Sequence, residues 1–109
     1  MEDESVIRGY NDVMNLAELL KAKRKEILGI AEKHGAHNVR VFGSVVRGDA
    51  GEQSDVDFLV ELDRNCSLMD HAALLADLEK LLGCKVDVAP EDRLRPKFRD
   101  RILKEAIPL

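Results

Sequence analysis

The chain has 109 residues, enough for one domain that buries about two-thirds of its unfolded surface in a single core. Apolar residues make up 45% of the sequence and charged residues 35%, a balance typical of a globular protein with a charged exterior. The net charge of −4 argues against a general nucleic-acid binder, because such proteins need an excess of Lys and Arg to displace counterions from phosphates. The sequence has no run of eighteen apolar residues and no basic leader before an apolar segment, so we expect no membrane span, no secretory signal and a cytoplasmic location.

The first part of the chain predicts a leader followed by a helix. Residues 1–14 have weak periodicity, and we expect them to be frayed or partly helical. A capping-box pattern at Asn15 begins a helix whose apolar residues recur at helical spacing up to Gly35. Lys23 and Arg24 interrupt this apolar stripe. The helix is expected to pack on a sheet as part of the core.

Two strands and a tight turn follow this helix. The first strand is predicted over 38–42, and the second, over 56–62, follows a polar loop at 49–54. Between the first strand and the loop, a short helix is expected to begin after Gly43 and to end at Gly48.

The last part of the chain predicts helix, strand and helix. Ser67 begins a helix with one apolar stripe that ends at Gly83, and a third strand is expected over 85–89. Pro96 suits the first turn of a final helix. The residues expected to face inward around that helix are Leu94, Phe98, Ile102 and Ala106. Together these elements predict an α/β fold, a small mixed sheet with helices packed on one face.

The second strand carries a pair of carboxylates. Successive side chains of a strand point to opposite faces, so Asp55 and Asp57 project side by side while the apolar residues between and after them face the core. Two neighbouring carboxylates repel each other unless a cation lies between them, and Mg²⁺ prefers carboxylate oxygen, water and phosphate ligands. Asp87 adds a third carboxylate if its strand lies parallel to the second strand. A metal site is therefore predicted.

The turn after the first strand supplies groups that suit a phosphate. Gly43 allows a sharp turn, and Ser44 then lies at a helix N-terminus with a hydroxyl and free backbone N–H groups. Arg47 can lie on the same helical face and add a permanent positive charge. The turn and the carboxylate strand are therefore predicted to form one unit.

The two segments GSVVRG and SDVDFLV together resemble the Gly-Ser…Asp-x-Asp signature of the polymerase-β-like nucleotidyltransferase superfamily. The resemblance is closest to the minimal nucleotidyltransferase (MNT) domain proteins, and it implies the fold of that superfamily and a single minimal domain over 1–109. It also implies an enzyme that uses ATP as donor and binds two Mg²⁺ ions. The implied catalytic and metal-binding residues are Asp55, Asp57 and Asp87, and those implied for the β- and γ-phosphates are Gly43, Ser44 and Arg47.

Similar proteins include the MntA-type antitoxins of HEPN/MNT toxin–antitoxin modules. That resemblance implies a HEPN-domain toxin as partner and transfer of AMP to one of its hydroxyl groups, with tyrosine as the expected acceptor. An alternative of another class is a binding module that neutralises its partner by masking, without catalysis. Transfer to a small molecule is a third possibility, disfavoured because we expect no acceptor-presenting domain.

A basic run near the C-terminus is a separate signal. It comprises Arg93, Arg95, Lys97, Arg99, Arg101 and Lys104. The favoured interpretation is a solvated helix face, and the alternative is a docking surface for an acidic partner or RNA.

Overall fold

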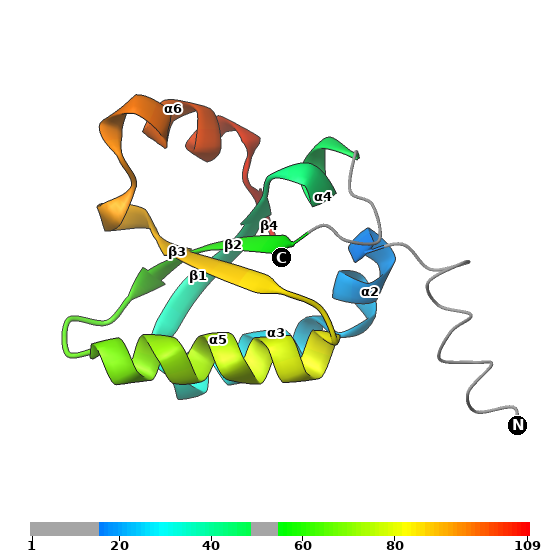
Figure 1. Cartoon of the computed structure of the whole chain (residues 1–109), viewed down its shortest axis with the longest axis vertical. Helices are drawn as coiled ribbons and strands as arrows, with labels where there is room; N and C mark the ends of the chain where they lie inside the picture. The colour runs from blue at the N-terminus through cyan, green and yellow to red at the C-terminus, as the bar shows by residue number, and fades with distance from the viewer. Residues whose placement is uncertain (1–15, 49–54) are drawn as a thin grey trace, which may run out of the picture.

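The computed structural model describes residues 16–48 and 55–109. The predicted leader and the polar loop at 49–54 lie outside the described residues. Helices α3 and α5 lie side by side across one face of a four-stranded sheet, while α6 stands on the other side (Figure 1). None of the helices in these two ranges is long and apolar enough to span a membrane.

The predicted first helix is two helices. Helix α2 runs over Leu16–Ala22 and α3 over Arg24–Lys33, with Lys23 between them at φ −102° and ψ 12°. The break falls where the charged pair interrupts the apolar stripe. Each helix can therefore turn its own apolar residues inward, and the buried ones are Leu19, Leu20, Ile27 and Ala31.

The sheet has the order β3-β2-β1-β4. Strand β1 (Ala36–Phe42) is antiparallel to β2 (Val56–Leu62) and to the short β4 (Ile107–Pro108), which the sequence did not predict. Strand β3 (Val86–Pro90) is parallel to β2, and helix α5 (Leu68–Leu82) makes the crossover between them. The mixed α/β class predicted from the sequence is confirmed.

Helix α5 has the ends that its sequence predicts. Ser67 accepts a hydrogen bond from the backbone N–H of Asp70, and Asp70 accepts one from the backbone N–H of Ser67, which is a complete capping box. Gly83 ends the helix in the left-handed conformation, at φ 69°. The buried residues of α5 meet Phe58 and its neighbours in the core between the sheet and the helices.

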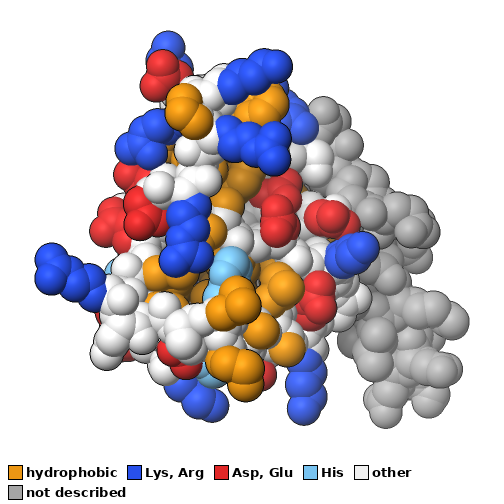
Figure 2. Space-filling view, turned by 60° about the vertical axis from the view of Figure 1, so that its left-hand side comes forward, with side chains coloured by type: hydrophobic (Ala, Val, Ile, Leu, Met, Phe, Trp, Pro, Cys, Tyr) orange, Lys and Arg blue, Asp and Glu red, His pale blue; other side chains and the backbone are white. Residues whose placement is uncertain are grey.

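The C-terminal helix differs from the prediction. After the short 3₁₀ turn η1 (Glu91–Arg93), helix α6 (Pro96–Glu105) begins at Pro96 as expected but buries none of its residues. The prediction that Phe98 faces the core is wrong. Its side chain is 36% exposed, with the charged groups of Lys97 and Arg101 at 5.7 and 5.5 Å from the ring centroid. Figure 2 shows Lys and Arg side chains gathered over this end of the molecule.

The sheet face on the α6 side is not bare. Leu59 lies on that face, as its alternation with Phe58 and Val60 requires, yet it is fully buried. Strand β2 contacts η1 there. Arg40 of β1 forms an ion pair with Glu91 of η1 at 2.7 Å between nitrogen and oxygen, which ties this turn to the sheet.

Candidate active site

The three predicted carboxylates gather at one end of two parallel strands. Asp57 and Asp87 are direct partners in the register between β2 and β3, so their side chains leave the same face of the sheet from strands about 4.8 Å apart. Asp55 is exposed and directly precedes β2. The predicted parallel arrangement that brings Asp87 beside Asp57 is thus present.

Asp57 lies half-buried among the charged groups of this end. Its pKa is raised from 3.8 to about 6, first by burial and then by the negative charges of Asp87 and Asp55. The positive charge of Arg47 acts in the opposite direction, and Glu105 adds a further raising contribution. Three carboxylates that repel one another in this way form a site where a cation would relieve the repulsion.

The turn at Gly43 lies against Asp57. Phe42, the last residue of β1, pairs with Asp57 of β2, so the next residue approaches the carboxylate. Gly43 is buried and has φ 83°, and a Cβ at this position would collide with Oδ2 of Asp57. Only glycine satisfies both the left-handed backbone and the close approach.

The short helix α4 (Ser44–Arg47) follows the turn as predicted and ends at Gly48, which has φ 82°. The backbone N–H groups of Val46 and Arg47 donate hydrogen bonds to the carbonyl oxygen of Gly43, and the N–H of Gly48 donates to that of Ser44. Ser44 is half-buried at the start of the helix, and Arg47 is exposed on its last turn. The turn and the carboxylate strands therefore form one unit, as the sequence predicts.

Glu105 is a member of this site that sequence reasoning missed. Its Oε2 accepts a hydrogen bond of 2.5 Å from the backbone N–H of Gly43, and both carboxylate oxygens lie within 3.1–3.3 Å of Nη1 of Arg47. One feature of the sequence could have indicated a special role for Glu105. An acidic residue at the C-terminal end of a helix opposes the helix dipole, and Glu105 is the last residue of α6.

The donor set of this end suits a hard divalent cation. Within residues 16–48 and 55–109, no group of three carboxylate, histidine or cysteine side chains is arranged closely enough to form a metal cage alone. Mg²⁺ seldom needs such a cage, because it usually takes one or two carboxylates and completes its shell with water and substrate phosphates. Asp55, Asp57 and Asp87 therefore fit Mg²⁺ delivered with a nucleotide.

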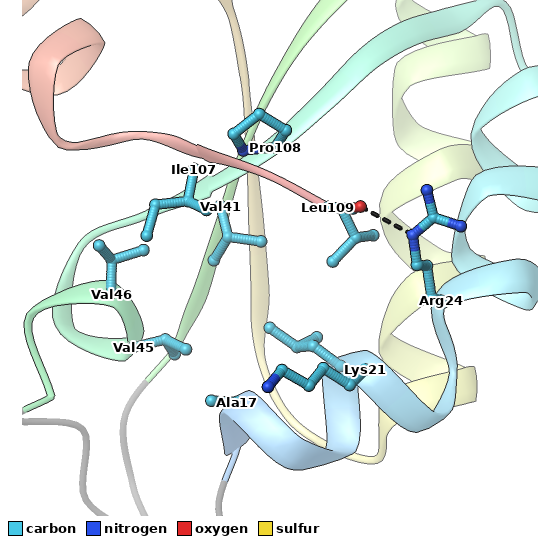
Figure 3. A pocket seen from close by; sticks show the side chains of 10 residues that line it. Ala17, Lys21, Arg24, Val41, Val45, Val46, Ile107, Pro108 and Leu109 are labelled. Atoms are coloured by element: carbon cyan, nitrogen blue, oxygen red, sulfur yellow. Dashed lines mark hydrogen bonds between the residues drawn. The ribbon is translucent and has the colours of Figure 1, made fainter.

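A separate cavity of about 380 Å³ lies between α2, β1, α4 and β4 (Figure 3). Val41, Val45, Val46 and Ile107 contribute to its apolar lining, and none of the three carboxylates lines it. Arg24 and Leu109 also line the cavity, and Nε of Arg24 donates a hydrogen bond of 2.8 Å to the carbonyl oxygen of Leu109.

Residues 22–109 match the family model of the nucleotidyltransferase domain. The chain is 37% identical over 92 residues to the protein adenylyltransferase MntA of Thermococcus cleftensis, covering 84% of this chain and 90% of the relative. Among solved structures, a minimal nucleotidyltransferase superposes with a TM-score of 0.77 at 50% identity, over 84% of this chain and 94% of that one. A chain of a toxin–antitoxin complex with AMP-PNP has a TM-score of 0.67 at 16% identity, over 77% of this chain and 69% of that one, which shows a shared fold alone.

Proposed function

Because the chain belongs to the nucleotidyltransferase domain family, we propose that it transfers AMP from ATP to a tyrosine hydroxyl of a HEPN-domain toxin and so acts as the antitoxin. The observation that carries this proposal is the parallel register of Asp57 and Asp87 beside the Gly43 turn. This arrangement puts a crowded set of carboxylates next to groups that can hold a phosphate chain. Such a pair of sites serves phosphoryl-type transfer, in which the protein mostly positions groups and stabilises charge.

The proposed reaction uses each part of the site once. The acceptor oxygen forms a bond to the α-phosphorus of ATP, the bond from that phosphorus to the bridging oxygen breaks, and pyrophosphate leaves. Asp55 and Asp57 would hold two Mg²⁺ ions, which supply positive charge against the phosphates. Asp87 would take the proton of the acceptor hydroxyl, or would complete the second ion site, in which case the proton would pass to water.

The phosphate side of the reaction falls to the turn. The Gly43 turn and the Ser44 hydroxyl would hold the β- and γ-phosphates, and Arg47 would offset the charge that develops on the leaving pyrophosphate. Gly43 is required here because a side chain would enter the space of Asp57. The turn thereby keeps the phosphate chain close to the metal-binding carboxylates.

The name of one relative and the description of one solved structure support a nucleotide donor and a protein acceptor. The Thermococcus cleftensis protein carries the name protein adenylyltransferase, which favours AMP transfer to a protein. The toxin–antitoxin chain of the same fold was solved with AMP-PNP, an analogue of ATP, which favours ATP as donor and a toxin as partner.

The second candidate function is neutralisation by masking. It is favoured by the exposed surface of α6, which buries none of its residues and carries most of the basic run. Such a surface can dock an acidic partner without any catalysis.

The test combines binding and protection. Asp55→Asn with Asp57→Asn keeps side-chain size but removes the charge that would hold the cations, so we expect the double variant to bind the toxin, to transfer no AMP and to leave cells unprotected. Asp92→Asn, a change at an exposed residue of η1, is the matched control and should behave as the unchanged protein. Full protection by the double variant would refute catalysis as the mechanism and favour masking.

A further inference from the structure

Glu105 occupies hydrogen-bond donors that the proposed reaction needs for the phosphates of ATP. Its carboxylate bonds to the N–H of Gly43 and to the guanidinium of Arg47, two groups assigned above to the phosphate chain. A carboxylate and a phosphate are both anionic acceptors, so each would use the same donors. A hydrogen bond of 2.5 Å to one N–H leaves no room for a second anion on it.

The position is also unfavourable for Glu105 in other respects. The side chain is only 16% exposed, it lies where the negative end of the α6 dipole opposes it, and it is close enough to Asp57 to help raise the pKa of that carboxyl group. A contact that only held the end of α6 against the Gly43 turn would not require a charged side chain close to other carboxylates. An occupant that can be displaced by a stronger anion accounts for these features.

The backbone that follows Glu105 is held by separate contacts. Strand β4 pairs with β1, the N–H of Leu109 donates to the carbonyl oxygen of Val39 at 3.0 Å, and Arg24 holds the carbonyl oxygen of Leu109. None of these bonds involves the Glu105 carboxylate. The side chain can therefore leave the turn by rotating about its own bonds while the C-terminal strand stays in place.

We propose that Glu105 competes with the nucleoside triphosphate for its binding site. In the free protein, the Glu105 carboxylate occupies the hydrogen-bond donors of Gly43 and Arg47, and this competition sets the affinity for ATP. This inference rests on the assignment of these donors to phosphate in the proposed function. Binding of the triphosphate turns the Glu105 side chain away, since a carboxylate and a polyphosphate cannot share the same donors. Part of the binding free energy of ATP is spent on this exchange.

The test is equilibrium binding of Mg²⁺-ATP, and of Mg²⁺-tripolyphosphate as a probe without a base, measured by calorimetry. Glu105→Gln keeps the volume and one acceptor but removes the charge, and Glu105→Ala removes both. We expect the dissociation constant to fall a few-fold in Glu105→Gln and about tenfold in Glu105→Ala, the equivalent of one charge-assisted hydrogen bond. Glu32→Gln, at an exposed residue of α3, is the matched control and should bind as the unchanged protein.

A third variant tests whether the competition runs through Arg47. Adding Arg47→Ala to Glu105→Ala removes a donor that both anions use, so the gain from losing Glu105 should shrink. Glu105→Gln supplies the conservative arm if Glu105→Ala lowers the melting temperature.

The outcomes separate this inference from the proposed function. Tighter binding of both probes by the Glu105 variants supports competition, and so does binding that appears only in those variants. Equal or weaker binding by the Glu105 variants, while the unchanged protein binds ATP, refutes the competition and leaves the proposed function standing, with Glu105 as a positioning residue. Absence of ATP binding in every variant refutes both.

Discussion

Replacing Asp57 by Asn should raise the stability of the metal-free protein and should remove most of the stabilisation that Mg²⁺-ATP gives the unchanged protein. In the folded, metal-free protein the pKa of Asp57 is about 6, against 3.8 for an ordinary aspartate. Below pH 3.8 the group is protonated in the folded and the unfolded chain, and it then contributes no penalty. Between pH 3.8 and about 6 the unfolded chain releases this proton while the folded chain keeps it, so the free energy of unfolding falls, and above about 6 it stays at the lower value.

The size of this penalty follows from the pKa shift. The difference between a pKa of 3.8 and one of about 6 corresponds to about 3 kcal/mol, since each tenfold change in an equilibrium constant is about 1.4 kcal/mol. Asp57 is half-buried, so water and salt screen its neighbours and we expect about 1–2 kcal/mol at pH 7.5. Asn cannot ionise and escapes the penalty. For a domain of this length, Asp57→Asn should then raise the melting temperature by roughly 5–10 °C.

Thermal melts of both proteins between pH 3.5 and 8 in a chelating buffer measure this effect, with Asp92→Asn as the control for a simple change of net charge. The advantage of Asp57→Asn should vanish toward pH 3.5. With Mg²⁺-ATP the unchanged protein should gain stability by ligand linkage, and the variant should gain little. If the metal-free variant is no more stable than the unchanged protein at pH 7.5, or if Mg²⁺-ATP stabilises both equally, the assignment of Asp57 to a crowded metal-binding end is wrong.

Three further predictions test the turn and a helix cap. Gly43→Ala should lower the free energy of unfolding by roughly 2 kcal/mol or more, because it combines a left-handed backbone with a collision, whereas Gly29→Ala in the exposed interior of α3 should raise it by about 0.5–1 kcal/mol; denaturant titration compares them. Ser44→Ala should lower kcat/KM a few-fold and Arg47→Ala about 10- to 100-fold while both variants keep the fold, and unchanged kinetics in both would reduce the turn to a structural role. Ser67→Ala should cost about 1 kcal/mol through the lost cap of α5 and leave transfer unchanged, so a loss of activity equal to that of Arg47→Ala would contradict the separation of this helix end from the site.

Local sequence patterns were sufficient to predict the strand that carries Asp57 and the start of helix α5. Strand alternation separates Asp55 and Asp57 from Val56 and Phe58, and the bounds of β2 agree with the prediction because charged and polar residues flank an apolar run. The capping box at Ser67 likewise needs only residues close in the chain. Roles in binding and catalysis remain proposals for these residues.

Other features depend on packing that a local pattern does not contain. Phe98 recurs at helical spacing and therefore predicts a core position, but α6 lies too far from the main core to bury it. Leu59 shares the carboxylate face and is nevertheless fully buried, because η1 returns to cover that face. The break at Lys23 follows from the need of two short helices to turn separate apolar residues toward the sheet.

The sequence by itself determined the kind of chemistry, since the glycine-serine turn and the carboxylates are read from residue types and short spacings along the chain. Only the tertiary structure decided that a carboxylate near the C-terminal end of the chain contacts the Gly43 turn. Glu105 reaches Gly43 across 62 positions of sequence, and this contact exists because β4 pairs with β1 and so returns the end of α6 to the turn. A contact between residues so distant depends on the whole packed sheet, whereas the pleat of a single strand is a property of its own backbone.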